Sequence, residues 1–399
     1  KDERRGRQPT SRAPPPPLGR TGWFLHRISE PHYFTTDNYF CDAKERKLDT
    51  AAHTKLKGFG FMFLSSSLMG GIGAFARYID APGDFISFFR SFSGLIGISI
   101  FFLVVGGFAK VRATRFTPAI FFSGLFLGLL SALYVISTQY TTLANASFLI
   151  YTGPVYSTIL ATIFLREPFK PAMIGSLAAV VIGTLLIVQI ISEEGFKLDL
   201  DPKYTFGNIM GLLSGVAYGL YLFASRYRTD CDSNVRAWYN FLFAVLTIGV
   251  MVAMRWSQLT YVVREKVDGV PTAKLDESGN TVTAAWDLFS MDARTWVVLI
   301  VAALMTGFGA FYFLTLASKI LLAGELATIS YQETIMASLL GLAFFQERLS
   351  GMQMLGGLLI ISGGVSQVYF STRGKKGTAD EIESEPEPEE ASQPSAAAS

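Results

Sequence analysis

Two stretches of the chain decide its fold. Residues 144–156 read ANASFLIYTGPVY, and residues 324–336 read GELATISYQETIM. Each lies in a long apolar segment that closes on a glutamate, in FLREPF at 164–169 and in FFQERL at 344–349. The second stretch therefore repeats the first. The aligned pairs are Tyr151 with Tyr331, Glu167 with Glu347 and Gly183 with Gly363 at an offset of 180, and Ser65 with Ser214 and Gly70 with Gly219 at an offset of 149.

Apolar segments of this kind recur along the chain. Half of the 399 residues are hydrophobic and 17% are charged, whereas a soluble domain carries about a quarter charged residues. About 20 apolar helical residues cross a bilayer core, and a soluble core would instead need amphipathic stripes with charged outer faces. The ten predicted spans are 58–79, 84–109, 117–138, 143–165, 171–191, 205–226, 235–255, 294–317, 323–345 and 351–370.

The repeat and the number of spans together predict the architecture. Each half holds five spans, an odd number, so the halves must cross the membrane in opposite directions. The predicted fold class is an all-α integral membrane protein of ten transmembrane helices, built as two inverted five-helix repeats around a central site. The predicted divisions are a disordered N-terminal tail at 1–52, a first repeat at 53–191, a second repeat at 192–370 with a long polar loop at 256–293, and a disordered acidic C-terminal tail at 371–399.

The distribution of charge predicts the orientation in the membrane. With ten spans, both termini share one side. Nine Lys and Arg lie in the short loops on that side and four on the other, where Asp and Glu also gather. Cytoplasmic loops carry an excess of Lys and Arg, so both termini are expected in the cytoplasm and the 256–293 loop opposite. The plasma or inner membrane is the expected location, and an organelle membrane stays open.

Several of these features resemble one known family. The five-plus-five layout, Pro154 in the fourth span and a helix end of the form L-x-E-P are similar to the EamA type of the drug/metabolite transporter superfamily. The resemblance covers residues 58–370, and Arg90 lies where that family often carries an Arg. The chain departs from the pattern at Thr334, where Pro is usual, and in its longer 256–293 loop. The resemblance implies a ten-helix exporter or importer of metabolites with a cavity lined by spans 1, 3, 4, 6, 8 and 9.

Charged residues inside the spans are the first candidates for a functional site. Each costs on the order of 2.5–3.5 kcal/mol at a helix centre on insertion scales, so it should face protein or water. Glu333, predicted near the midplane, is interpreted as a proton-titrating or ammonium-binding group, with a structural acid as the alternative. Arg90 is expected to pair with a substrate carboxylate or with Glu333, unless it forms a fixed pair or reaches the interface. Glu325 is interpreted as a helix cap, and Glu167 and Glu347 as structural helix ends.

Tyrosine and amide side chains complete the predicted site. A tyrosine offers an apolar ring and one hydroxyl, which suits a cavity for partly apolar metabolites, although tyrosines near helix ends are more often interface anchors. Tyr151 and its counterpart Tyr331 are preferred, and Pro154 is expected to kink its helix. The substrate-binding or coupling candidates are Arg90, Tyr134, Asn145, Tyr151, Pro154, Tyr218, Tyr312, Tyr331, Gln332 and Glu333.

Composition limits the chemistry that is expected. All three histidines lie before the first predicted span, and the two cysteines match no metal spacing, so no catalytic residue, cofactor or metal is predicted. The chain contains no G-x-x-x-x-G-K-[ST] motif, which excludes direct use of ATP through such a loop. The chain is therefore predicted not to be an enzyme.

The predicted function is secondary transport of small organic metabolites by alternating access, with amino acids or related compounds as the first choice. One alternative is a nucleotide-sugar or sugar-phosphate antiporter of an organelle, which would favour more cations in the cavity than Arg90. A membrane receptor or enzyme subunit is a second alternative. The expected partners are a small-molecule substrate and the lipid bilayer, without nucleic acid, and a homodimer stays open.

Overall fold

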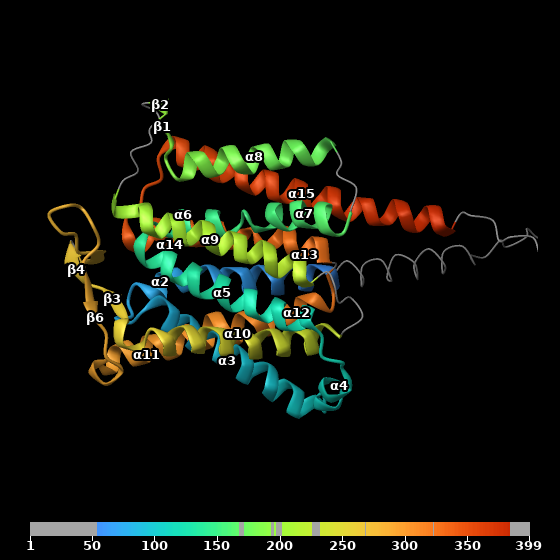
Figure 1. Cartoon of the computed structure of the whole chain (residues 1–399), viewed down its shortest axis with the longest axis horizontal. Coiled ribbons are helices and arrows are strands. Elements are labelled where there is room, and N and C mark those ends of the chain that lie inside the picture. Colours follow the sequence, from blue (N-terminus) through green and yellow to red (C-terminus); the bar gives the residue numbers. More distant parts are fainter. Residues whose placement is uncertain are drawn as a thin grey trace, which may run out of the picture. The chain divides into compact units, whose positions relative to one another are not determined.

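The described part of the chain is a bundle of apolar helices. The computed structural model describes residues 54–166, 171–192, 195–196, 202–225, 232–267, 269–321 and 323–383. All ten predicted spans are helical there (Figure 1). Seven helices within this part are long and apolar enough to cross a membrane, and two are shorter, Ile174–Ile187 and Gly351–Ser366.

The helix bounds follow the predicted spans closely. The first span covers Thr54–Ala76 and ends with α2. The others are α3 Gly83–Val105, α4 Phe108–Ala113, α5 Pro118–Tyr140, α6 Leu143–Ile150, α7 Gly153–Phe164, α8 Pro171–Ile187, α9 Pro202–Ser225, α10 Ser233–Met254, α11 Ala293–Ala302, a π-helical segment Ala303–Gly309, α12 Ala310–Ser318, α13 Ala323–Ser330, α14 Gln332–Phe345 and α15 Gly351–Glu383, with α2 itself being Ile72–Ala76.

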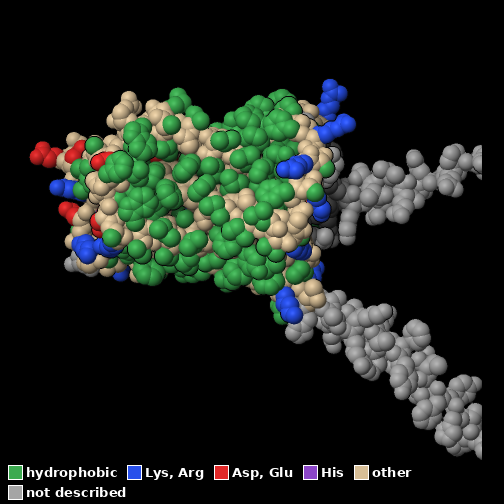
Figure 2. All heavy atoms as spheres, turned by 90° about the horizontal axis from the view of Figure 1, so that it is seen from below, with side chains coloured by type: hydrophobic (Ala, Val, Ile, Leu, Met, Phe, Trp, Pro, Cys, Tyr) green, Lys and Arg blue, Asp and Glu red, His purple; other side chains and the backbone are tan. Residues whose placement is uncertain are grey.

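Large apolar side chains cover the outside of the bundle. Leu103, Val104, Phe164 and Met254 each expose more than 60% of their surface. Figure 2 shows the hydrophobic side chains as a broad belt, with charged side chains gathered at its two ends. In lipid a helix satisfies its own backbone groups and leaves apolar side chains facing the acyl chains. The protein is therefore a multi-pass integral membrane protein.

Equivalent spans of the two halves pack against each other. The second spans α3 and α10, the fourth-span and ninth-span helices α6 and α14, and the fifth spans α8 and α15 form contacting pairs. Figure 1 shows α8 beside α15 at one edge of the bundle and α3 beside α10 at the other. Matching members that pair in this way are related by a pseudo-twofold axis, which confirms the predicted inverted repeat.

The fourth and ninth spans are both broken, at equivalent positions. In the fourth span α6 ends before Tyr151, and α7 begins after Thr152. In the ninth span α13 ends before Tyr331, and α14 begins directly after it. The aligned tyrosines thus mark the two breaks, and at the kink expected near Pro154 the α-helical hydrogen bonding is interrupted at Tyr151 and Thr152.

A glycine from another span lies against each break. A Cβ added to Gly70 would lie 2.8 Å from the carbonyl oxygen of Glu333, and one added to Gly219 would lie 2.9 Å from that of Gly153. Both distances are too short for a real side chain, so glycine is required at both places. The two repeat offsets relate Gly70 to Gly219 and Glu333 to Gly153, so both halves contain the same close approach.

The long polar segment between α10 and α11 is folded, which the sequence did not predict. Strand β3 pairs antiparallel with β6, and β4 pairs antiparallel with β5 to form a hairpin. This hairpin contacts α14. We call this end of the bundle, which carries Arg77, Thr141 and Glu347, the loop end. The short elements are β1 Ile191–Ser192, β2 Gly195–Phe196, β3 Thr260–Val262, β4 Arg264–Val267, β5 Val270–Ala273 and β6 Thr283–Ala285, with 3₁₀ turns Trp256–Gln258 and Leu288–Ser290.

Helix α15 corrects one predicted boundary. It continues to Glu383, beyond residue 370 where the tenth span was expected to end. The first part of the predicted C-terminal tail is therefore helical, because nothing in the sequence from 371 to 383 interrupts the helix with proline. The rest of that tail, the N-terminal tail and Glu167 lie outside the described residues.

Candidate functional site

Glu333 and Tyr151 meet between the two broken spans. Glu333 lies in the first turn of α14 and is 9% exposed. The Tyr151 hydroxyl lies 2.8 Å from Glu333 Oε2 and 2.7 Å from the carbonyl oxygen of Ser330. The Tyr151 hydroxyl has one hydrogen, so towards an ionised Glu333 it must share that hydrogen between the two acceptors. If Glu333 is protonated, the acid can donate to the Tyr151 oxygen, and both contacts become full hydrogen bonds. The geometry therefore accommodates the neutral acid best.

Arg90 lies near this carboxyl without pairing directly with it. Its Nη2 donates to Ser131 Oγ at 2.5 Å, and its Nε is buried with no hydrogen-bond partner among the described residues. An ionised Glu333 would attract the Arg90 guanidinium. The expected Arg90–Glu333 ion pair is thus absent from the described contacts, because the Arg90 guanidinium donates its hydrogen bond to the hydroxyl of Ser131 instead.

Three tyrosines surround the Tyr151–Glu333 contact. The ring of Tyr331 lies 4.8 Å from that of Tyr151, centroid to centroid, and the ring of Tyr218 lies edge-on at 6.1 Å. The Tyr331 hydroxyl is buried without a hydrogen-bond partner in the described part of the chain. The Tyr134 hydroxyl lies 3.1 Å from Ser147 Oγ and also interacts with Glu333. The predicted Tyr151, Tyr218 and Tyr331 therefore form one aromatic cluster beside Glu333, and the hydroxyl of Tyr134 lies near the same carboxyl.

Three other predicted residues lie outside the contact between Tyr151 and Glu333. Gln332 Oε1 accepts a hydrogen bond from Ser66 at 3.0 Å, which joins the first span to the ninth. Asn145 belongs to a polar network towards the loop end, where Gln353 Nε2 donates to its Oδ1 at 3.4 Å. Pro154 lies in the first turn of α7, where its missing N–H costs no helical bond.

Tyr312 is not brought to the site, which corrects its prediction. It is 49% exposed, and its ring contacts those of Phe308 and Phe313. The physical reason is that a helix apolar on all sides carries no amphipathic signal for which face turns inward. The cluster consists instead of residues from spans 2, 3, 4, 6 and 9.

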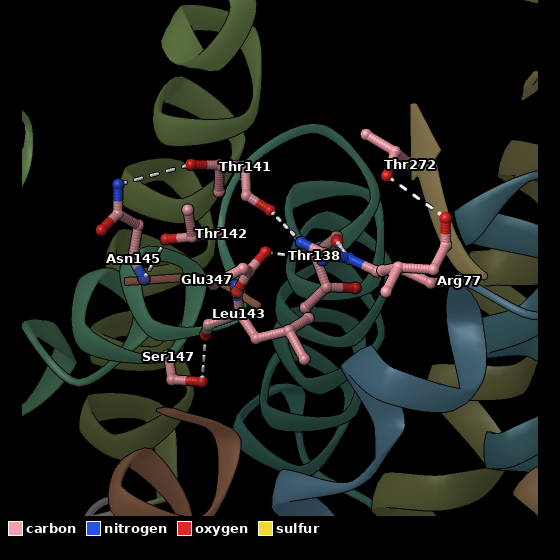
Figure 3. Close-up of polar contacts among 10 residues, drawn as sticks. Arg77, Thr138, Thr141, Thr142, Leu143, Asn145, Ser147, Thr272 and Glu347 are labelled. Atoms are coloured by element: carbon pink, nitrogen blue, oxygen red, sulfur yellow. Dashed lines mark hydrogen bonds and ion pairs between the residues drawn. The ribbon is translucent and has the colours of Figure 1, made fainter. Parts of the chain in front are cut away.

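A second polar cluster at the loop end was not predicted. Arg77 Nη1 lies 2.6 Å from Glu347 Oε1, and the other Glu347 oxygen accepts the backbone N–H of Leu143 at 2.9 Å. Figure 3 shows these residues together with Thr138 and Thr141. Glu347 was interpreted only as a helix end, and Arg77 only as a loop charge. The available signal was that both lie at span ends on the same predicted side of the membrane.

No metal site is visible in the described ranges. Within them, no group of three or more His, Cys, Asp or Glu side chains is placed to hold a metal ion. The polar groups that meet between the broken spans are a carboxyl, a guanidinium and several hydroxyls. Such groups can bind a polar organic molecule and exchange a proton.

Two known proteins are similar to this chain. One protein from Archaeoglobus fulgidus, described as an uncharacterized transporter, is 28% identical over 165 residues, which are 41% of this chain and 54% of that protein. The chain thus matches about half the length of that relative. A solved structure titled only as the crystal structure of a protein matches with a TM-score of 0.48 at 18% identity, over 80% of this chain and 98% of that one.

A family match covers more of the chain. The EamA-like transporter family matches residues 56–189, which are the first five spans, and residues 281–366, which are the last three. The matched segments include both broken spans and Arg77, Glu333 and Glu347. This agrees with the resemblance found in the sequence and with the inverted repeat in the structure. The chain therefore belongs to the EamA-like transporter family.

Proposed function

We propose that this protein is a secondary transporter of small carboxylate-bearing metabolites, amino acids first, which works by alternating access and is driven by protons through Glu333. The observation that carries the proposal is the contact of the Tyr151 hydroxyl with Glu333 Oε2 at 2.8 Å, between the facing breaks of two equivalent spans. In inverted-repeat transporters, substrate and coupling-ion sites lie at discontinuous helices near the midplane. Membership of a transporter family also points to a protein that is not an enzyme.

An unpartnered donor supports a substrate with a carboxylate. Arg90 Nε is buried without a partner among the described residues, whereas the unpartnered Tyr331 hydroxyl lies against Gly364 of α15. A buried donor left unpaired costs about 1–3 kcal/mol, and a bound carboxylate would remove that cost. The rings of Tyr151 and Tyr218 would receive the apolar or ammonium part of the same molecule. A phosphate-bearing substrate is less well matched, because Arg90 is the cation that this cluster contains.

The protonation of Glu333 supports coupling to a proton gradient. When the acid is neutral, both contacts of Tyr151 are satisfied and Arg90 has no carboxylate partner, so it is available to an anionic substrate group. When the proton leaves, Glu333 becomes a buried carboxylate that attracts Arg90. Proton and substrate would then bind together and leave together, which is the requirement for symport.

The orientation is part of the proposal. On the face that Figure 2 draws, one end of the belt carries acidic side chains together with some Lys and Arg, and the other end carries Lys and Arg without acidic side chains. The acidic end is the loop end, and the basic end includes Lys110 and Arg112 of α4. The excess of Lys and Arg in cytoplasmic loops supports a cytoplasmic basic end. A cysteine at Ser278 should then react with an impermeant thiol reagent on intact cells, whereas protection of that cysteine would reverse the orientation.

Reconstitution tests the function. The purified full chain in liposomes should accumulate labelled amino acids when a pH gradient is imposed, and a protonophore should abolish the accumulation. Empty liposomes and a sodium gradient at equal pH are the controls. Binding without any flux would contradict the proposal and indicate a receptor. Exchange of sugar phosphates that ignores the pH gradient would favour an antiporter.

A further inference from the structure

One carboxylate joins three spans at the loop end. Glu347, which follows α14 of the ninth span, holds Arg77 of the first span through Oε1 at 2.6 Å. Its Oε2 accepts the N–H of Leu143 at 2.9 Å. Leu143 is the first residue of α6, so Glu347 also caps the N-terminus of the broken fourth span, where a negative charge stabilises the helix. The ends of spans 1, 4 and 9 are thus fixed by a single side chain (Figure 3).

All three guanidinium nitrogens of Arg77 have a partner in this arrangement. Its Nε donates to the carbonyl of Thr138 at 3.1 Å and its Nη2 to that of Thr141 at 2.7 Å. Its guanidinium also lies over the ring of Phe345, at 4.7 Å from the centroid. The Arg77 and Glu347 side chains are only 11% and 14% exposed. The pair is therefore shielded from water, where removing one partner matters far more than on a surface.

An apolar layer lies beside the pair. Leu143, Ala337 and Phe345 form a buried cluster. Two further side chains pack against it, Tyr78, which follows the first span, and Val270 of the hairpin. Ala337 is one helical turn from Glu333 on α14. The apolar layer therefore lies between the ion pair at the loop end and the Tyr151–Glu333 contact.

A second arginine opposes the pair. Both terminal nitrogens of Arg264, at the start of β4, are buried without a hydrogen-bond partner among the described residues. Burial, and then the charge of Arg77, lower the pKa of Arg264 to about 9, while Asp80 and Tyr140 act in the opposite direction. The Arg264 side chain therefore remains cationic at neutral pH and repels Arg77.

We propose that Glu347 is a positioning residue for transport, which closes the loop end by holding Arg77 and the N-terminus of α6 together. The inference rests on the proposed transport function, and it assigns the loop-side closure of the central site. Opening at this end requires the Arg77–Glu347 pair to separate, which also releases the first half of the fourth span. Opening of the loop end and movement of α6, which leads to Tyr151, are thus coupled.

Access of a buried cysteine measures this closure directly. The reporter is Ala337→Cys, in a background in which Cys41 and Cys231 are replaced by serine, and the probe is an impermeant thiol reagent added at the loop end of the reconstituted protein. Glu347→Gln, which keeps an acceptor for the Leu143 N–H, should raise the labelling rate about tenfold. Arg77→Gln should do the same, and Arg77→Lys should restore most of the protection.

The matched control breaks another ion pair at the same end. Arg255 Nη1 lies 3.4 Å from Asp84 Oδ2, and neither residue contacts the Glu347 cluster through a described bond. Asp84→Asn should leave the labelling rate within about twofold of the starting protein. An equal rise in this variant and in Glu347→Gln would overturn the inference, because any lost charge would then open the loop end.

Arg264 gives a prediction of the opposite sign. Arg264→Gln removes the buried cation that acts on Arg77, so it should slow the labelling of the cysteine. Lys266→Gln, an exposed charge on the same strand, should leave the labelling rate unchanged. Faster labelling in Arg264→Gln would overturn the opposition between the two arginines.

The outcomes separate the inference from the proposed function. If Glu347→Gln melts lower and its labelling rate is unchanged, Glu347 is a helix cap only and the inference is overturned. If the starting protein shows no flux of any amino acid, the proposed function fails, but the labelling still reports whether the pair closes the loop end. Raised labelling together with loss of substrate accumulation supports both.

Discussion

In the fourth span the break is followed by Gly153 and Pro154, and in the ninth span the equivalent positions hold Glu333 and Thr334. At Gly153 an added Cβ would lie 2.5 Å from the ring of Tyr218, so no side chain fits. At Glu333 the same backbone position carries a carboxyl that reaches Tyr151. The halves share one backbone break, and only the second half adds an ionisable group to it.

The two breaks are also stabilised differently. Pro154 has no N–H, and in the first turn of α7 none is needed. Thr334 instead donates both its N–H, at 3.1 Å, and its hydroxyl, at 2.6 Å, to the carbonyl of Tyr331. The comparison teaches that the repeated geometry sets where each helix is interrupted. The residues at each break decide whether it holds a close helix contact, as at Gly153, or an ionisable group, as at Glu333.

The largest expected effect comes from removing the charge that only the ninth-span break contains. One pH unit of gradient supplies about 1.4 kcal/mol per proton, which is about tenfold accumulation for one proton per substrate. Glu333→Gln should fold normally, lose that accumulation in reconstituted liposomes and partly retain substrate exchange. Arg90→Ala should weaken substrate binding, and the double variant should lose less than the sum of the two. Normal proton-driven uptake in Glu333→Gln would leave this acid a structural group.

The fourth-span break should be sensitive to packing. Gly153→Ala should lower the free energy of unfolding by about 1–3 kcal/mol, because the methyl group would overlap the Tyr218 ring. Denaturant titration in detergent measures the change. Gly175→Ala is the control, since a Cβ there has nothing within 4 Å and alanine favours a helix. Similar stability in both variants would contradict the tight contact at Gly153.

The same substitution at the two aligned tyrosines sharpens the comparison. Tyr151→Phe removes the hydrogen bonds of a paired hydroxyl, so it should cost about 1 kcal/mol of stability. Tyr331→Phe removes an unpartnered buried hydroxyl that lies against Gly364 of α15, so its stability should stay equal or rise and the substrate concentration for half-maximal uptake should stay the same. Thermal unfolding and uptake kinetics on both variants check this. Equal destabilisation would mean that Tyr331 has a partner within the protein.

The smallest effects are expected from the residues that follow the breaks. Pro154→Ala restores an N–H in the first turn of α7, where that group has no helical acceptor, so stability should change by less than about 0.5 kcal/mol. Thr334→Pro removes the two bonds to the Tyr331 carbonyl and should cost about 1 kcal/mol. Unfolding titrations compare the two. A larger loss in Pro154→Ala would show that proline, and not the repeated geometry, enforces the break.

Much of the fold was predictable from the sequence. Ten apolar runs and the offsets relating Tyr151 to Tyr331 and Gly70 to Gly219 were sufficient for ten spans in an inverted repeat. Run length is a local property, because any helix in lipid must bury its own backbone and present apolar side chains. Glu333 could be selected in the same way, because an acid inside such a run is costly and needs a partner.

Only the tertiary structure decided which partners those residues have. Tyr151 and Glu333 are 182 positions apart in the chain, and their contact depends on how two broken helices rotate about their axes. The rotations of the other helices likewise place Arg90 in hydrogen-bonding distance of Ser131, turn Tyr312 outward and bring Arg77 to Glu347. An apolar helix looks alike on every side in its sequence, so its inward face is fixed only when it packs against its neighbours.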